Sequence, residues 1–230
     1  MHRHFFASLF CCAAISALLA GGQGKKTRGM SDTALLARRV AGMDSRQVPL
    51  ASAFESALSL AQVPGGIVLM KGCKSVPSTV VIVHGTTLGS VLKSIERADP
   101  SYHWIVEDGV VNLLPRRGVP QLLRVKVKTF EVNNAANPSD AANMLFALPE
   151  FREGAVHLSL TQGGVQSFLS SGGEQPGAPQ GENRRFDLHL ENLTVLSALN
   201  AIVRANKGGI WIYNERYCNA HGVFNIGFSQ

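Results

Sequence analysis

The stretch VLKSIERADPSYHWIV, from Val91 to Val106, decides the fold, because a close copy, ALNAIVRANKGGIWIY, runs from Ala198 to Tyr213. Both stretches begin with apolar residues spaced three and four apart, which is the pattern of an amphipathic helix. Both then pass through a break into a short run of aromatic and β-branched residues that is typical of a strand. The sequence therefore predicts one helix–strand unit present twice.

The copy extends upstream of the helix. At an offset of 107 residues, residues 84–106 lie over residues 191–213 without a gap. The identical pairs are Thr87 and Thr194, Ser90 and Ser197, Leu92 and Leu199, Ile95 and Ile202, Arg97 and Arg204, Ala98 and Ala205, Trp104 and Trp211, and Ile105 and Ile212. The apolar pairs fall at helical spacing, so the repeat indicates a duplicated core.

Each copy is predicted to form a module of the order β-α-β-β-α-β-β. In the first copy Asp108-Gly109 separates two β-rich runs, and this dipeptide is the strongest short signal for a hairpin. The fold class is therefore α+β, with two tandem modules whose helices pack on small sheets. Module 1 is expected at residues 46–116, and module 2 at residues 121–230 with a mobile, Gly- and Ser-rich loop at 161–185.

The N-terminus has the layout of a signal peptide. In MHRHFFASLFCCAAISALLAGG, residues 1–22, a basic start precedes an apolar run that is shorter than the roughly 20 residues of a membrane span. Residues 23–45 are expected to form a flexible leader. We predict a bacterial protein that is periplasmic or secreted, with no membrane span after signal cleavage.

The first copy resembles a known family, the small secretin/TonB N-terminal (STN) domain. The resemblance rests on Leu50, Ala57 and Leu58 in the first helix, Val81 and Val83 in a strand, Leu88, Leu92 and Ile95 in the second helix, and Tyr102, Trp104, Val110 and Val111 in the hairpin. It covers about residues 46–115, and a weaker match covers residues 122–228. These are packing positions, so the resemblance implies a fold and not an activity. No secretin pore or TonB-dependent barrel follows in this sequence, and we expect a free-standing exported protein.

Two cysteines follow the predicted signal peptide. Export would place Cys73 and Cys218 in an oxidising compartment, which makes them a candidate disulfide, with two separate buried thiols as the alternative. Cys218 also lies close to His221, and a small exported hydrolase using this pair is an alternative function. In an exported protein a structural cysteine is the favoured interpretation.

A candidate face for an anionic partner is formed by basic residues. Arg124, Lys126 and Lys128 alternate along a predicted strand, and Arg116 and Arg117 lie just upstream. The alternative interpretation is a solvated face, or protection of a sheet edge. Nucleic acid is not an expected partner of an exported chain whose net charge is only +6.

Other chemistry-bearing patterns are incomplete. Ser90-x-x-Lys93 matches a serine–lysine signature, but the Ser-Asp-Asn and Lys-Thr-Gly motifs that accompany it are missing from the sequence. No HExxH motif occurs, and neither a catalytic residue nor a metal or cofactor site is predicted. Trp104 and Trp211 are interpreted as core residues. The favoured function is a non-enzymatic protein–protein interaction module of the cell envelope, and the second alternative is a structural subunit that forms oligomers.

Overall fold

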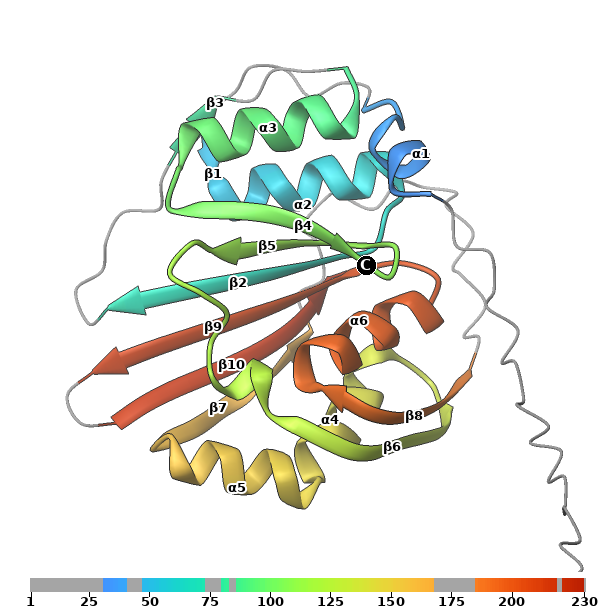
Figure 1. The fold of residues 1–230 in the computed structure, drawn as a ribbon, viewed down its shortest axis with the longest axis vertical. Helices are drawn as coiled ribbons and strands as arrows, with labels where there is room; N and C mark the ends of the chain where they lie inside the picture. Colours follow the sequence, from blue (N-terminus) through green and yellow to red (C-terminus); the bar gives the residue numbers. More distant parts are fainter. Residues whose placement is uncertain are drawn as a thin grey trace, which may run out of the picture.

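The computed structural model describes residues 31–40, 47–72, 80–82, 86–167, 185–218 and 221–229, and for residues 47, 80–82, 164–167 and 218 it describes the backbone alone (Figure 1). The predicted signal peptide at residues 1–22 lies outside these residues. The chain is a mixture of helices and strands with a mixed sheet, so the predicted α+β class is confirmed.

The first half of the chain contains three helices and five strands in the described residues. They are α1 (Asp32–Leu36), β1 (Gln47–Pro49), α2 (Leu50–Ala61), β2 (Gly65–Gly72), β3 (Val80–Ile82), α3 (Leu88–Ala98), β4 (Tyr102–Glu107) and β5 (Val110–Pro115). The described part of the second half begins with a 3-10 turn. Its elements are η1 (Leu122–Arg124), β6 (Lys126–Ala135), α4 (Pro138–Ala147), α5 (Pro149–His157), β7 (Leu160–Ser167), β8 (Phe186–Thr194), α6 (Val195–Ala205), β9 (Ile210–Cys218) and β10 (His221–Ser229).

The repeated helices α3 and α6 begin in the same way. Thr87 precedes α3, and its side chain accepts a hydrogen bond from the backbone N–H of Ser90. Thr194 precedes α6 and accepts from the backbone N–H of Ser197. A threonine in this position satisfies one of the backbone N–H groups that the first turn leaves free, which stabilises a helix by about 1 kcal/mol. The identical Thr87 and Thr194 of the sequence are therefore helix caps.

The strands of the two halves pair in the same order and join into one sheet. The six-stranded sheet has the order β4-β5-β2-β9-β10-β7, so β4-β5-β2 of the first half is followed by β9-β10-β7 of the second. In each half two strands form an antiparallel hairpin and the third runs parallel to the hairpin's second strand. β1 pairs with β3, and β6 pairs with β8, as two separate two-stranded sheets.

The two halves meet where β2 runs parallel to β9. Their register runs from Gly65 opposite Ile210 to Gly72 opposite Tyr217. The sequence predicts helices on small sheets within each module, and the structure instead merges two three-stranded sheets into one. A continuous sheet removes two edges that would otherwise expose unpaired backbone groups.

The two hydrophobic cores lie on opposite faces of this sheet. α2 and α3 cover one face, and α4, α5 and α6 cover the other (Figure 1). Because successive strand residues point to opposite faces, Ile210 and Ile212 enter the core of α2 and α3, whereas Trp211 and Tyr213 enter the core of α4 and α6. Each core therefore contains side chains from both halves.

Two stretches that the sequence predicts as flexible are in part regular structure. Within the predicted leader at 23–45, residues 32–36 form α1, where Leu35 is buried; Val40, beyond it, is buried as well. Within the predicted loop at 161–185, residues 161–167 belong to β7, and residues 168–184 lie outside the described residues. No helix in the described part of the chain has the length and apolar character that crossing a membrane requires.

Candidate functional site: the outer edge of β4

Strands β4 and β9 occupy equivalent positions in the two halves but have different neighbours. β9 pairs with β10 on one side and with β2 on the other. β4 pairs with β5 on one side, and no other described strand pairs with it. The outer edge of β4 is therefore the counterpart of the β9 edge that β2 completes.

The hairpin register shows which backbone groups face this outer edge. Asp108 and Gly109 both have positive φ, of 52° and 77°, as a two-residue type I′ turn requires. Such a turn makes Glu107 and Val110 a hydrogen-bonded pair, and hydrogen-bonded pairs alternate along an antiparallel hairpin. The backbone N–H and C=O groups that point away from β5 are therefore those of Tyr102, Trp104 and Val106.

The completed edge of β9 supports this assignment. The backbone N–H of Gly65 donates to the carbonyl oxygen of Gly209 over 3.1 Å. Gly209 is the repeat equivalent of Tyr102, so the same alternate residues face outward in both halves. On β9 they are bonded to β2, and on β4 they are presented to a strand that the described chain does not supply.

Trp211 shows how a neighbouring strand completes such an edge. Its side chain is fully buried, and its indole Nε1–H donates to Asn200 Oδ1 over 2.8 Å. Its ring lies directly over Gly66 of β2, where a Cβ atom would come within 2.2 Å of the ring. The missing side chain of Gly66 is therefore what lets β2 pair beside the tryptophan.

Trp104 holds the same repeat position on the free edge. Its side chain is half-buried and packs against the core of α2 and α3. Its indole Nε1–H is buried and has no hydrogen-bond acceptor among the described residues, and the neighbouring His103 Nδ1 is buried without a hydrogen-bond partner there. Both tryptophans are core-packing residues, as the sequence predicts, but only Trp211 is completely covered.

The free edge of β4 lacks the features that usually prevent pairing between sheets. Its sequence, YHWIVE, contains no Lys, Arg or Pro, and its pairing with β5 has no bulge. All six residues are half-buried. Strand edges of soluble proteins are commonly blocked by lysine, proline or a bulge, and the described β4 has none of these features.

The predicted basic face does not lie on one strand. Lys126 and Lys128 are exposed on β6, but Arg124 belongs to the 3-10 turn η1 that precedes it. Arg117 is exposed in the turn after β5. The interpretation of three alternating cations on one strand is corrected in this respect, because the chain turns at residues 122–124 before β6 begins.

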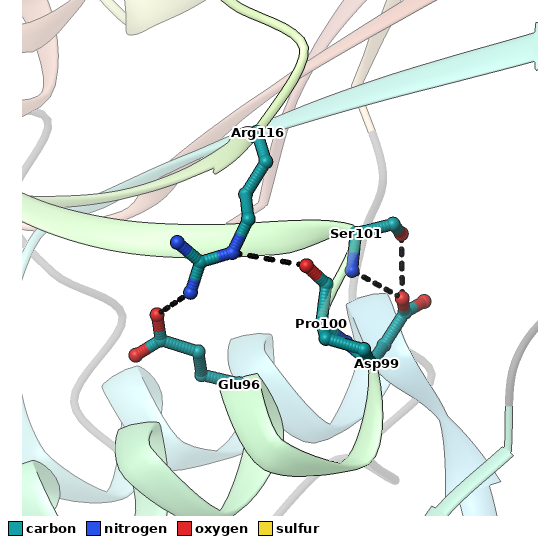
Figure 2. Close-up of polar contacts among 5 residues, drawn as sticks. All are labelled: Glu96, Asp99, Pro100, Ser101 and Arg116. Carbon is teal, nitrogen blue, oxygen red and sulfur yellow. Dashed lines mark hydrogen bonds and ion pairs between the residues drawn. The ribbon is translucent and has the colours of Figure 1, made fainter.

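Arg116 has partners within its own half (Figure 2). Its guanidinium forms an ion pair with Glu96 of α3, and its Nε–H donates to the carbonyl oxygen of Pro100 over 2.9 Å. Beside it, Asp99 accepts hydrogen bonds from the backbone and side chain of Ser101. Arg116 therefore connects the end of β5 to the turn between α3 and β4.

The cysteines are described only in part. Cys73 lies outside the described residues, and for Cys218, the last residue of β9, only the backbone is described. The register pairs Gly72 with Tyr217, and the two cysteines directly follow these residues in the chain. His221 is exposed and pairs with Cys218 in the β9–β10 hairpin.

Ser90 of the serine–lysine pattern takes part in helix capping. Its Oγ accepts from the backbone N–H of Thr87 and donates to the carbonyl oxygen of Thr87. The described residues contain no group of three or more His, Cys, Asp or Glu side chains that could hold a metal ion.

Sequence reasoning did not identify the outer edge of β4. Two signals for it were nevertheless present: the tryptophan at equivalent positions, and the Gly65-Gly66 pair, which was interpreted as a break between helix and strand. No protein-family model, no curated protein and no solved structure matches this chain.

Proposed function

We propose that this protein is a non-enzymatic interaction module of the bacterial cell envelope that binds an extended segment of a partner protein along the outer edge of β4. The single observation that carries the proposal is the difference between β9, which β2 completes, and its repeat equivalent β4, which no described strand completes. Strand addition at a sheet edge is a common mode of peptide recognition.

The internal junction specifies the chemistry of the partner segment. β2 runs parallel to β9, so the partner strand runs parallel to β4. Gly66 lies opposite Trp211, so the partner carries glycine opposite Trp104. The outward groups of Tyr102, Trp104 and Val106 supply the main-chain hydrogen bonds, and the half-buried indole of Trp104 supplies the apolar contact.

The proposal also includes the predicted module family and the predicted location of this protein. The two halves are proposed to be STN-like modules, delivered to the periplasm or secreted by the signal peptide at residues 1–22. The order of strands and helices recurs in the second half with α5 as an additional helix, and this recurrence supports the modular part. A partner that pairs through its backbone needs no metal, cofactor or reactive side chain in this protein.

A peptide that copies β2 is the appropriate probe, because β2 is the strand that completes the equivalent edge. We expect the peptide VPGGIVLMKG, residues 63–72, carrying a solubilising lysine tag, to bind the full chain and change the fluorescence of Trp104. The matched control peptide has valine at the position of Gly66, where a side chain would meet the indole. Equal binding of both peptides, or binding of neither, would contradict the proposal.

A protein variant localises the binding. Val106→Pro removes one outward N–H of β4 and retains the hydrogen bonds of the β4–β5 hairpin, since prolines are accommodated at sheet edges. We expect this variant to keep its circular dichroism spectrum and to lose peptide binding. Unchanged binding by a folded Val106→Pro variant would place the peptide elsewhere.

A further inference from the structure

The junction between the two halves joins two unlike edges. β2 is the third strand of the first half's sheet, and β9 is the first strand of the hairpin in the second half. The strands left at the ends of the six-stranded sheet are β4, which is equivalent to β9, and β7, which is equivalent to β2. The two outer edges of the sheet, on β4 and β7, are therefore the counterparts of the two edges that pair at the internal β2–β9 junction.

The rotation and translation that relate the first half of the molecule to the second can be applied again to place a second molecule. β9 runs parallel to β2, whereas its equivalent β4 runs antiparallel to β2, and the helices of the two halves cover opposite faces of the sheet. One operation produces both the reversed strand direction and the opposite helix faces. It is a half-turn about an axis that lies in the sheet perpendicular to the strands, combined with a shift of three strands along that axis. Applied once more, it places β4 of a second molecule parallel to β7 of the first.

We propose that the partner strand at the outer edge of β4 is β7 of a second copy of this chain, so that molecules associate head to tail into a continuous sheet. This inference rests on the proposed function, because it uses the same edge and names its partner. Continuity with the β2–β9 junction supports it: the contact requires the same parallel pairing that the chain already makes within itself.

The glycine opposite the tryptophan selects the register. β7 contains Gly163-Gly164 followed by Val165, as β2 contains Gly65-Gly66 followed by Ile67. Gly163 and Gly164 lie where the pairing of β7 with β10 is irregular, between Gln162 and Val165. With Gly164 opposite Trp104, the regular residues 165–167 of β7 lie opposite residues 105–107 of β4. This register differs by two residues from that of the β2–β9 junction, and a shift of two residues preserves the alternation of the strand between the two faces of the sheet.

The pairing of unlike edges has a consequence for assembly. A two-fold contact joins two molecules and is then complete, but a contact between two different surfaces leaves one of each surface free on the resulting dimer. Such a contact generates an open row of molecules when the rotation from one molecule to the next does not lead to a closed ring. Two applications of the half-turn restore the original direction, so successive molecules are related mainly by translation and by the twist of the sheet. We expect a concentration-dependent series of masses and not a discrete dimer.

Sedimentation velocity and light scattering on the full chain test the inference. Val106→Pro blocks the β4 edge, and Gly164→Val blocks the β7 edge, and circular dichroism verifies that each variant is folded. We expect each variant alone to be monomeric. A mixture of the two should form a one-to-one dimer, because each variant retains the edge that the other has lost.

The outcomes separate this inference from the proposed function. Gly164→Val should still bind the β2 peptide, because its β4 edge is intact, and excess peptide should dissociate the wild-type rows without any substitution. Peptide binding by a wild-type chain that stays monomeric at high concentration would overturn head-to-tail association and leave the proposed function standing. Association of Gly164→Val with itself would indicate a two-fold contact and would also overturn the inference.

Discussion

The indole of Trp211 donates a hydrogen bond to Asn200 Oδ1 over 2.8 Å in a fully buried site. Trp104, its repeat equivalent, has a buried Nε1–H with no acceptor in the described part of the chain. The difference follows from the covering helices, because the acceptor Asn200 lies on α6 and its repeat equivalent on α3 is Lys93, whose ammonium group cannot accept a hydrogen bond.

The two tryptophans are therefore expected to differ in their contribution to stability. Trp211→Phe removes the hydrogen bond, leaves Asn200 unpaired and opens a void, so we expect the free energy of unfolding to fall by about 3 kcal/mol. Trp104→Phe is the matched control and should cost less than about 1 kcal/mol, because no described acceptor is lost. Urea unfolding measures both values, and equal losses would contradict the assignment.

Gly66 is expected to be the least replaceable glycine of β2. In Gly66→Ala the new Cβ would meet the Trp211 ring at 2.2 Å and Asn112 Oδ1 at 2.5 Å. Overpacking of this kind typically costs 1–3 kcal/mol, and we expect a value of about 3 kcal/mol or more because both neighbours are buried. Gly72→Ala, at the other end of the strand, meets nothing within 4 Å and serves as the control in thermal unfolding. A similar loss from both substitutions would show that backbone flexibility, and not the tryptophan, sets the cost.

The local structure could be predicted from the sequence to a large extent. The apolar stripe through Leu88, Val91, Leu92 and Ile95 predicts a helix, and these four residues are the buried face of α3. Asp108-Gly109 predicts a hairpin and forms the turn between β4 and β5. These signals are local, because each depends on residues that are neighbours in the sequence.

The joining of the halves could not be predicted in this way. β2 and β9 are separated by most of the chain, and no local pattern records that they pair. Gly65 and Gly66, which suggested a break, are the first residues of β2, where Gly66 allows contact with Trp211. The free edge of β4 could not be predicted from local sequence either, because an edge is free only if no other strand of the chain pairs with it.

Cys73 and Cys218 are expected to form a disulfide when the chain is exported. The described register ends with Gly72 opposite Tyr217, and the two cysteines are the next residues of the sequence after this pair, which is the basis of the expectation. We expect reduction to lower the free energy of unfolding by about 3 kcal/mol. Thiol titration of the native chain measures the bond, and Cys73→Ser and Cys218→Ser should be equally destabilising. Reactive thiols at both positions in the exported protein would contradict it.

The three tyrosines of the chain predict a loss of stability at alkaline pH. Burial raises the pKa of Tyr213 well above its ordinary value of 10.0, and the hydrogen bond to Glu215 and its charge add to this. Burial likewise raises the pKa of Tyr102, with a small contribution from the charge of Asp99 and partly offset by a hydrogen bond with the Met70 backbone, and it raises the pKa of Tyr217, to which Glu215 contributes.

The sign of the effect follows from proton binding. Below pH 10 folded and unfolded tyrosines are both protonated, so these groups add no pH dependence. Above pH 10 the unfolded chain loses protons that the folded chain keeps, and the free energy of unfolding falls as the pH rises. Tyr213→Phe should reduce this slope. Phenolate absorbance measures the titration, and tyrosines that ionise near pH 10 in the folded chain would contradict the prediction.

Amide hydrogen exchange of the full chain, at a concentration low enough to keep it monomeric, tests the central claim most directly. The N–H groups of Trp211 and Tyr213 face β2, and those of Trp104 and Val106 are their repeat equivalents on the free edge. We expect the β9 amides to exchange at least about a hundredfold more slowly than the β4 amides. Equal protection of the two pairs would show that the outer edge of β4 is already covered, and it would contradict the account.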